Sequence, residues 1–94
     1  MDWSDRERSG NLQVTVKLYA TLGRFLPPGA ERNAISMDIA EGTTVSSLIE
    51  QLKLPPELTH LVLINGSYVE PSARGDRVFR EGDEFAVFPP IAGG

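Results

Sequence analysis

The stretch that decides the fold is residues 12–20, which read Leu12-Gln13-Val14-Thr15-Val16-Lys17-Leu18-Tyr19-Ala20. Two faces alternate along it: Leu12, Val14, Val16 and Leu18 form an apolar face, and Gln13, Thr15, Lys17 and Tyr19 form the other. This period of two, with its β-branched residues, is typical of a strand that is buried on one side only. The rest of the chain therefore has to pair with this strand and cover its apolar face.

Three further segments have strand character, and a tight turn follows one of them. Residues 33–39 alternate in the same way, residues 61–64 form a short apolar run, and residues 84–88 precede a pair of prolines. Asn65-Gly66 is the strongest two-residue hairpin signal in the chain. Residues 67–69 are therefore predicted to return beside 61–64.

A helical pattern separates the first two strands from the later ones. Apolar residues fall at i, i+3, i+4 and i+7, namely Val45, Leu48, Ile49 and Leu52. Thr44 is the predicted N-cap, because its hydroxyl can accept a hydrogen bond from a free amide of the first turn. Pro55-Pro56 is predicted to end the helix near Lys53, and residues 23–32, which contain Pro27-Pro28-Gly29, are predicted to form a loop.

The element order β-β-α-β-β, with room for one more short strand, predicts an α+β fold. One helix covers one face of a sheet this size, so the other face is expected to be open to solvent. The first strand needs a second neighbour, and the last strand is the natural candidate. This is the β-grasp (ubiquitin-like) roll, a mixed sheet with one main helix packed on one face. We place the domain at residues 12–90, between a flexible extension at 1–11 and a flexible tail at 91–94.

Length and composition exclude several classes of protein. The 94 residues allow one domain, and the absence of cysteine excludes disulfide scaffolds, Cys-ligated metals and thiol nucleophiles. Basic residues are scattered and number 9 against 13 acidic ones, which argues against nucleic-acid binding. No apolar run is long enough to cross a membrane, and the charged N-terminus is no secretory signal, so a cytoplasmic protein is expected.

The open face of the predicted sheet carries apolar side chains where polar ones are usual. If Leu18 faces the helix, alternation sends Tyr19 and Phe88 to the other side, and in 61–64 we expect Leu63 to point outward. Aromatic and aliphatic residues together on an open face suggest a docking patch. The alternative is that the loop carrying Phe25 and Leu26 covers them, or that each is exposed singly.

The end of the chain, Gly93-Gly94, is the second unusual feature. It has no side chains beside its carboxylate, and Pro89-Pro90 stiffens the exit from the sheet. Such a tail suits a carboxylate that must enter a narrow active site of another protein. On composition alone, it also fits an ordinary frayed end.

Residues 88–94, Phe-Pro-Pro-Ile-Ala-Gly-Gly, resemble the C-terminal signature of the molybdopterin synthase small subunit. That subunit belongs to the ubiquitin-like sulfur carriers, as does the carrier of thiamine biosynthesis. The segments 16–20, 42–45, 65–66 and 81–84 fit the same family in order. The resemblance covers about residues 12–94 and implies a β-grasp fold.

The resemblance also implies chemistry at Gly94 instead of a catalytic site within the chain. An E1-like enzyme would use ATP to adenylate the Gly94 carboxylate, and a sulfur source would convert the acyl-adenylate to a thiocarboxylate. The tail would then enter the large subunit of molybdopterin synthase, where its sulfur passes to a pterin precursor. The chain would therefore be a carrier subunit and co-substrate, not an enzyme by itself.

The resemblance assigns roles to particular residues. Gly94 and Gly93 would be the reacting end, and the partner-binding residues would be Tyr19, Leu63, Phe88, Pro89, Pro90, Ile91 and Ala92. No metal site and no bound cofactor are expected, because the activating enzyme holds the ATP and the sulfur rides covalently on the C-terminus. The free chain is expected to be a monomer that docks.

Several alternatives stay open. The tail favours the pterin branch, but residues 75–80 show no pattern that assigns a subfamily, so thiamine or another sulfur-containing metabolite is an alternative. A protein modifier joined to lysines through Gly94 would use the same activation, and a non-covalent binding module would not use the tail. His60 is interpreted as a loop histidine, and Asp83 and Glu84 as turn and strand residues rather than metal ligands.

Overall fold

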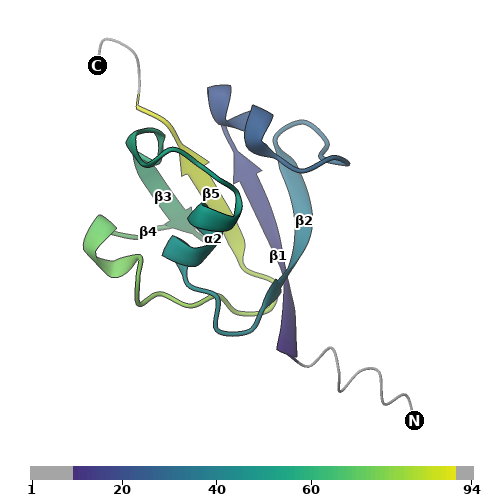
Figure 1. The fold of residues 1–94 in the computed structure, drawn as a ribbon, viewed down its shortest axis with the longest axis vertical. Helices are drawn as coiled ribbons and strands as arrows, with labels where there is room; N and C mark the ends of the chain where they lie inside the picture. The colour runs from purple at the N-terminus through teal and green to yellow at the C-terminus, as the bar shows by residue number, and fades with distance from the viewer. Residues whose placement is uncertain (1–9, 91–94) are drawn as a thin grey trace.

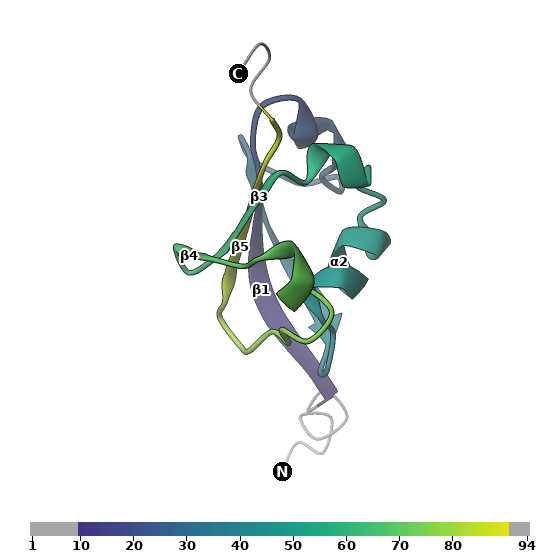
Figure 2. The ribbon, with the colours of Figure 1, turned by 90° about the vertical axis from the view of Figure 1, so that its left-hand side faces the viewer.

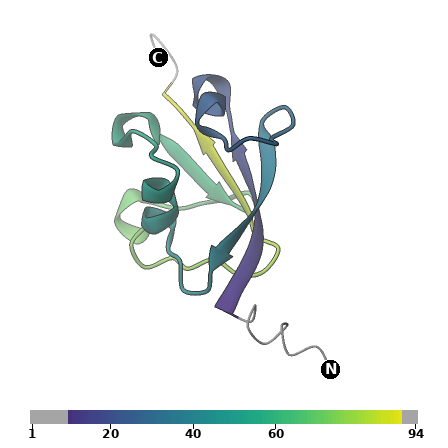
Figure 3. The same cartoon turned by 45° about the vertical axis from the view of Figure 1, so that its right-hand side comes forward.

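The computed structural model describes residues 10–90, which form one five-stranded sheet with the strand order β2-β1-β5-β3-β4 (Figure 1). The strands are β1 (Asn11–Leu18), β2 (Ala34–Ala40), β3 (Leu61–Ile64), β4 (Ser67–Tyr68) and β5 (Glu84–Phe88). β1 runs antiparallel to β2 and parallel to β5, so the first and last strands are neighbours, as predicted. The sheet is therefore mixed, and β2 lies at one edge of it (Figure 3).

The helical segments cover one face of the sheet. Figure 2 shows α2 (Val45–Gln51) on the same side as the short 3₁₀ turns η2 (Ala20–Phe25), η3 (Pro56–Leu58) and η4 (Pro71–Ala73). The buried core lies between these segments and the sheet, and its fully buried members include Val14, Val16, Leu18, Leu22, Val45, Leu48, Val62, Phe85 and Val87. One main helix on one face of a mixed sheet confirms the predicted β-grasp class. Within residues 10–90, no helix has the length and apolar character that crossing a bilayer requires.

The first two strands differ from the sequence prediction in their boundaries. The first strand was predicted to reach Ala20, but β1 ends at Leu18 and Ala20 adopts a φ of 53° at the start of η2. The predicted loop at 23–32 therefore begins inside a 3₁₀ helix. The second strand is Ala34–Ala40, one residue later at each end than expected.

The ends of α2 show one correct and one incorrect prediction. Thr44 is the N-cap, and its Oγ1 accepts a hydrogen bond from the Ser47 amide at 3.1 Å. The prolines do not end the helix. Lys53 adopts a φ of 59°, its amide donates to the Glu50 carbonyl, and the Leu54 amide donates to the Ile49 carbonyl. This is a Schellman motif, which ends the helix before Pro55 is reached.

The hairpin between β3 and β4 forms where the sequence predicts it. Asn65 and Gly66 both have positive φ, 53° and 84°, as a type I′ turn requires. Ile64 then pairs with Ser67 across the turn. The predicted extension (1–11) lies outside the described residues except for its last two, and the tail (91–94) lies wholly outside them.

Candidate functional site

The face of the sheet opposite α2 carries an apolar patch over its three inner strands. Phe85 and Val87 of β5 are fully buried toward the helix, so Ala86 and Phe88 point to the open face. The strand register then places Leu61 opposite Phe88 and Leu63 opposite Ala86. We call Tyr19, Leu61, Leu63, Ala86 and Phe88 the open-face patch.

Tyr19 and Phe88 form the centre of this patch. Their rings stack with centroids 4.2 Å apart and planes 3° from parallel. Tyr19 directly follows β1, and its amide donates to the Val87 carbonyl at 3.1 Å, which holds the ring beside the end of β5. Both side chains remain half-buried. The parallel pairing of β1 with β5 thus brings together two aromatic residues that lie far apart in the sequence.

The neighbours of the stack include residues that the sequence analysis did not select. Leu63 points outward between the buried Val62 and Ile64, as predicted. Leu61 has the same orientation and lies directly beside Phe88, although it is not among the residues predicted from the sequence. Tyr68, opposite Leu63 on β4, is not among the predicted residues either, although its exposed fraction of 53% is large for an aromatic residue. Alternation along 61–64 would have identified Leu61.

An ion pair lies on the same face. Lys17 Nζ is 3.2 Å from Glu84 Oε2, and both side chains are partly exposed. Lys17 is opposite Ala86, which is only 6% exposed although it lies on the open face. The patch is therefore apolar at its centre and charged on the side toward the start of β5, which is the usual arrangement of a docking surface.

Phe25 and Leu26 pack against the buried core. The guanidinium of Arg24 lies 5.1 Å from the centre of the Phe25 ring. Pro89 and Pro90 continue from Phe88, half-buried and exposed respectively. The structure therefore places the exit toward Ile91, Ala92, Gly93 and Gly94 directly beside the Tyr19–Phe88 stack, although those four residues themselves are outside the described range.

Asp83 and Glu84, which the sequence analysis interprets as turn and strand residues, make structural contacts, and His60 lies at an exposed position. Asp83 is buried, and its carboxylate accepts hydrogen bonds from the Arg80 amide at 2.8 Å and from Asn65 Nδ2 at 2.9 Å. The Glu84 amide donates to Asn65 Oδ1 at 2.9 Å. His60 is exposed between η3 and β3. In residues 10–90, no three His, Asp or Glu side chains gather as a metal site would require.

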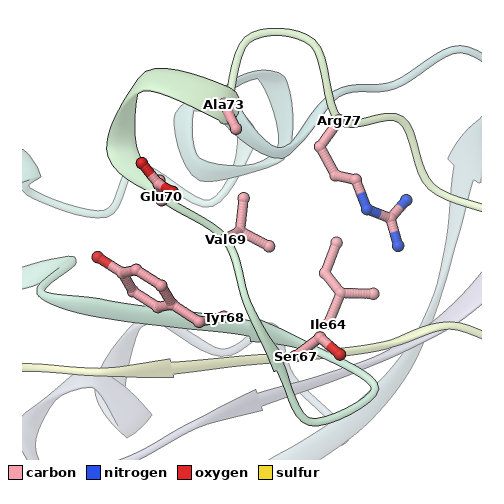
Figure 4. Close-up of a pocket in the computed structure, with 7 residues that line it drawn as sticks. All are labelled: Ile64, Ser67, Tyr68, Val69, Glu70, Ala73 and Arg77. Carbon is pink, nitrogen blue, oxygen red and sulfur yellow. The ribbon is translucent and has the colours of Figure 1, made fainter.

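A small hollow beside β4 is separate from the open-face patch. It has a volume of about 200 Å³ and is lined by Ile64, Ser67, Tyr68, Val69, Glu70, Ala73 and Arg77 (Figure 4). Its floor is aliphatic, and Glu70 and Arg77 lie on different sides of it. None of the residues that the sequence analysis selected lines this hollow, so the candidate site remains the open face of the sheet and the exit of the tail.

A comparison with protein families matches residues 28–94 to the ThiS family. The chain belongs to the ThiS family. The match covers most of the domain and the tail, and it identifies the chain with the sulfur carriers of ubiquitin-like fold, as the resemblance implied. No curated protein matches this ThiS-family chain.

Solved structures share the fold of this ThiS-family chain. The solution structure of HVO 2177 from Haloferax volcanii is 24% identical with a TM-score of 0.69, covering 90% of this chain and 89% of that one. SAMP1 from Haloferax volcanii is 23% identical with a TM-score of 0.61, covering 87% and 99%. A putative molybdopterin converting factor, subunit 1, from Pyrococcus furiosus is 26% identical with a TM-score of 0.61, covering 85% and 99%.

Proposed function

We propose that this ThiS-family chain is the small, sulfur-carrying subunit of a molybdopterin synthase. The observation that carries the proposal is the position of the Tyr19–Phe88 stack, half-exposed and directly before Pro89-Pro90. A partner that binds the open-face patch holds the start of the tail at a fixed place. Gly93 and Gly94 then extend from that place into the partner's active site.

In this proposal the chain supplies a carboxylate and the partners supply catalysis. An oxygen of the Gly94 carboxylate attacks the α-phosphorus of ATP on an E1-like enzyme, and pyrophosphate leaves. Sulfide then attacks the acyl carbon, AMP leaves, and the thiocarboxylate remains. The open-face patch binds first the activating enzyme and later the large synthase subunit. Gly93 and Gly94 are required because a side chain next to the reacting carbonyl would widen the tail.

The choice of the pterin pathway rests on two supports. One is the Phe-Pro-Pro sequence at 88–90. The other is the likeness to the Pyrococcus furiosus protein, which is described as a putative molybdopterin converting factor, subunit 1. The ThiS family by itself does not separate this pathway from thiamine synthesis. The Haloferax volcanii small archaeal modifier protein 1 shares the fold at 23% identity, so a modifier function stays a separate outcome of the experiment.

The test is a transfer reaction with two alternative acceptors. The chain is prepared with a Gly94 thiocarboxylate and mixed either with a large molybdopterin synthase subunit and its pterin precursor, or with a thiazole synthase and its substrates. We expect the protein to lose its sulfur, measured as the intact mass, only in the first mixture. Loss in the second mixture alone would assign the thiamine pathway. A third mixture contains the unmodified chain, an E1-like enzyme, ATP and added proteins, and amide-linked adducts on their lysines would assign a modifier function.

A further inference from the structure

The outer edge of β2 has a short stretch of unpaired backbone. In the antiparallel ladder with β1, the Leu18 amide donates to the Asn33 carbonyl and the Glu41 amide donates to the Gly10 carbonyl. Residues that exchange ladder hydrogen bonds alternate with residues whose N–H and C=O groups point away. Asn33 and Glu41, which flank β2 and bond to β1, both have odd numbers. The backbone N–H and C=O groups of the even-numbered residues of β2 therefore point away from β1.

Both ends of this edge are closed by the chain itself. Ala34 exchanges two hydrogen bonds with Glu31, each 3.0 Å long. At the other end, the Ala40 carbonyl accepts from the Thr43 amide at 3.1 Å and from Thr43 Oγ1 at 2.6 Å. Within residues 10–90, Ser36 and Asp38 are therefore left with their N–H and C=O groups free, together with the Ala40 N–H. We call Ser36–Asp38 the β2 window.

The side chains around the β2 window differ between the two faces of the sheet. Ile35 and Met37 point to the helix-covered side, pack against the core and stay half-buried. Ser36 and Asp38 point to the open face and are exposed. In a strand added here, every second side chain would lie beside Ile35 and Met37 on the helix-covered side. The side chains between them would lie on the open face, near Asp38.

The charge beside the Asp38 end of the window is negative. A hollow of about 340 Å³ on this part of the sheet is lined by Asn11, Leu12, Gln13, Asp38 and Glu81. It contains two carboxylates and no basic side chain. Glu81 Oε1 already accepts a hydrogen bond from the Gln13 amide, whereas the Asp38 carboxylate has no ion-pair partner within residues 10–90. Two β2 windows from separate copies would bring two Asp38 side chains near one another, which disfavours self-pairing.

We propose that the β2 window binds an extended, basic segment of a partner protein by strand addition, with alternating aliphatic and Lys or Arg side chains. The backbone groups of Ser36 and Asp38 supply the hydrogen bonds, Ile35 and Met37 receive the aliphatic side chains, and Asp38 receives the basic one. This surface is separate from the open-face patch and does not depend on the chemistry of Gly94. Both surfaces can therefore be occupied at the same time.

The test uses a short capped peptide in which valine alternates with lysine, added to the ¹⁵N-labelled full chain and followed by NMR. We expect saturable shifts of the Ser36, Asp38 and Ala40 amides. A matched peptide with glutamate in place of lysine is expected not to bind. Asp38→Lys is expected to weaken binding of the lysine peptide about tenfold or more. The substitution removes the attraction between the Asp38 carboxylate and a peptide lysine, and the new lysine repels the peptide.

A second pair of variants separates the backbone contact from the charge. Ser36→Pro removes an N–H that points away from β1, so the ladder stays intact and peptide binding is expected to be lost. Ser36→Ala keeps that N–H and is expected to bind like the natural chain. Circular dichroism and thermal unfolding check that both variants fold. If Ser36→Pro is unfolded, a peptide N-methylated along one edge replaces it, and that peptide is expected not to bind.

Several results would overturn the proposal. The lysine peptide could fail to give saturable shifts, the glutamate peptide could bind equally well, or the shifts could centre on Tyr19 and Phe88. Shifts of the window amides on raising the protein concentration alone would instead assign the edge to a second copy. The same shifts on deleting residues 1–9 would assign it to the chain's own N-terminal segment.

Discussion

Phe85 and Phe88 lie on the same strand and point to opposite faces of the sheet, which makes them a matched pair for one experiment. Phe85 faces the helix, is 0% exposed and meets Phe79 edge to face with centroids 5.3 Å apart. Phe88 faces solvent and stacks on Tyr19. Phe85 therefore serves stability, and Phe88 serves docking. Phe85→Ala is expected to lower mainly the stability of the fold, and Phe88→Ala mainly the affinity for a partner.

The structure gives a magnitude for each change. Truncating a fully buried phenylalanine costs about 3–5 kcal/mol, because burial is lost and a cavity remains. That is a large share of the roughly 5–15 kcal/mol that stabilises a small domain. Phe88 is already half-exposed, so Phe88→Ala loses the ring stack, worth about 0.5–1.5 kcal/mol, and part of the burial. We expect a total cost of about 2 kcal/mol or less.

Urea unfolding followed by circular dichroism measures the stability of each variant, and calorimetric titration with the E1-like enzyme measures its affinity for a partner. Phe88→Ala is expected to weaken partner binding by about 30-fold or more, the effect of losing about 2 kcal/mol at a central contact residue. Equal destabilisation by the two variants would show that Phe88 belongs to the core. Normal partner affinity of Phe88→Ala would refute the assignment of the patch.

Three further changes test local features by thermal or urea unfolding. Thr44→Ala should lower the free energy of unfolding by about 1 kcal/mol, because the hydrogen bond from the Ser47 amide to the cap is lost. Thr44→Ser keeps a hydroxyl and should lose much less, so equal losses in the two variants would argue against the cap. Lys53→Gly should stabilise by about 1 kcal/mol, since glycine adopts positive φ without strain, and a gain of the same size in Lys53→Ala would contradict this cause. Arg74 is 9% exposed, and its Nε and Nη2 atoms have no hydrogen-bond partner in residues 10–90, while Nη1 donates to the Thr59 carbonyl. Arg74→Met should therefore be neutral or stabilising, and Arg74→Ala should be destabilising. A severe loss of stability in Arg74→Met would contradict this reasoning.

The strands and the helix could be predicted because each has a strong local pattern. Each pattern is complete within a few residues of sequence. The examples are the alternation from Leu12 to Leu18, the helical spacing from Val45 to Leu52 and the Asn65-Gly66 turn. Two of the boundaries that differ from the prediction involve Ala20 and Lys53, which adopt positive φ although neither residue type favours it. Tertiary context determines those conformations, so no local signal was available.

The candidate site was only partly predictable for a related reason. The direction of Tyr19 and Phe88 follows from alternation, but their stacking depends on the parallel register of β1 and β5, which places Leu18 opposite Val87. The β2 window could not be predicted from the sequence, because its two ends are set by the hydrogen bonds of Glu31 and Thr43 to the edge of β2. Long-range pairing of this kind is not encoded in a short stretch of sequence.

The central claim is that Gly94 carries sulfur, and the intact mass tests it most directly. The chain is incubated with an E1-like enzyme, ATP and a sulfide source, next to a matched variant that lacks Gly94. The account predicts a gain equal to one oxygen replaced by one sulfur in the full chain, and no gain in the variant. An unchanged mass of the full chain with enzymes that activate other ThiS-family proteins, or the same gain in the variant lacking Gly94, would contradict the claim.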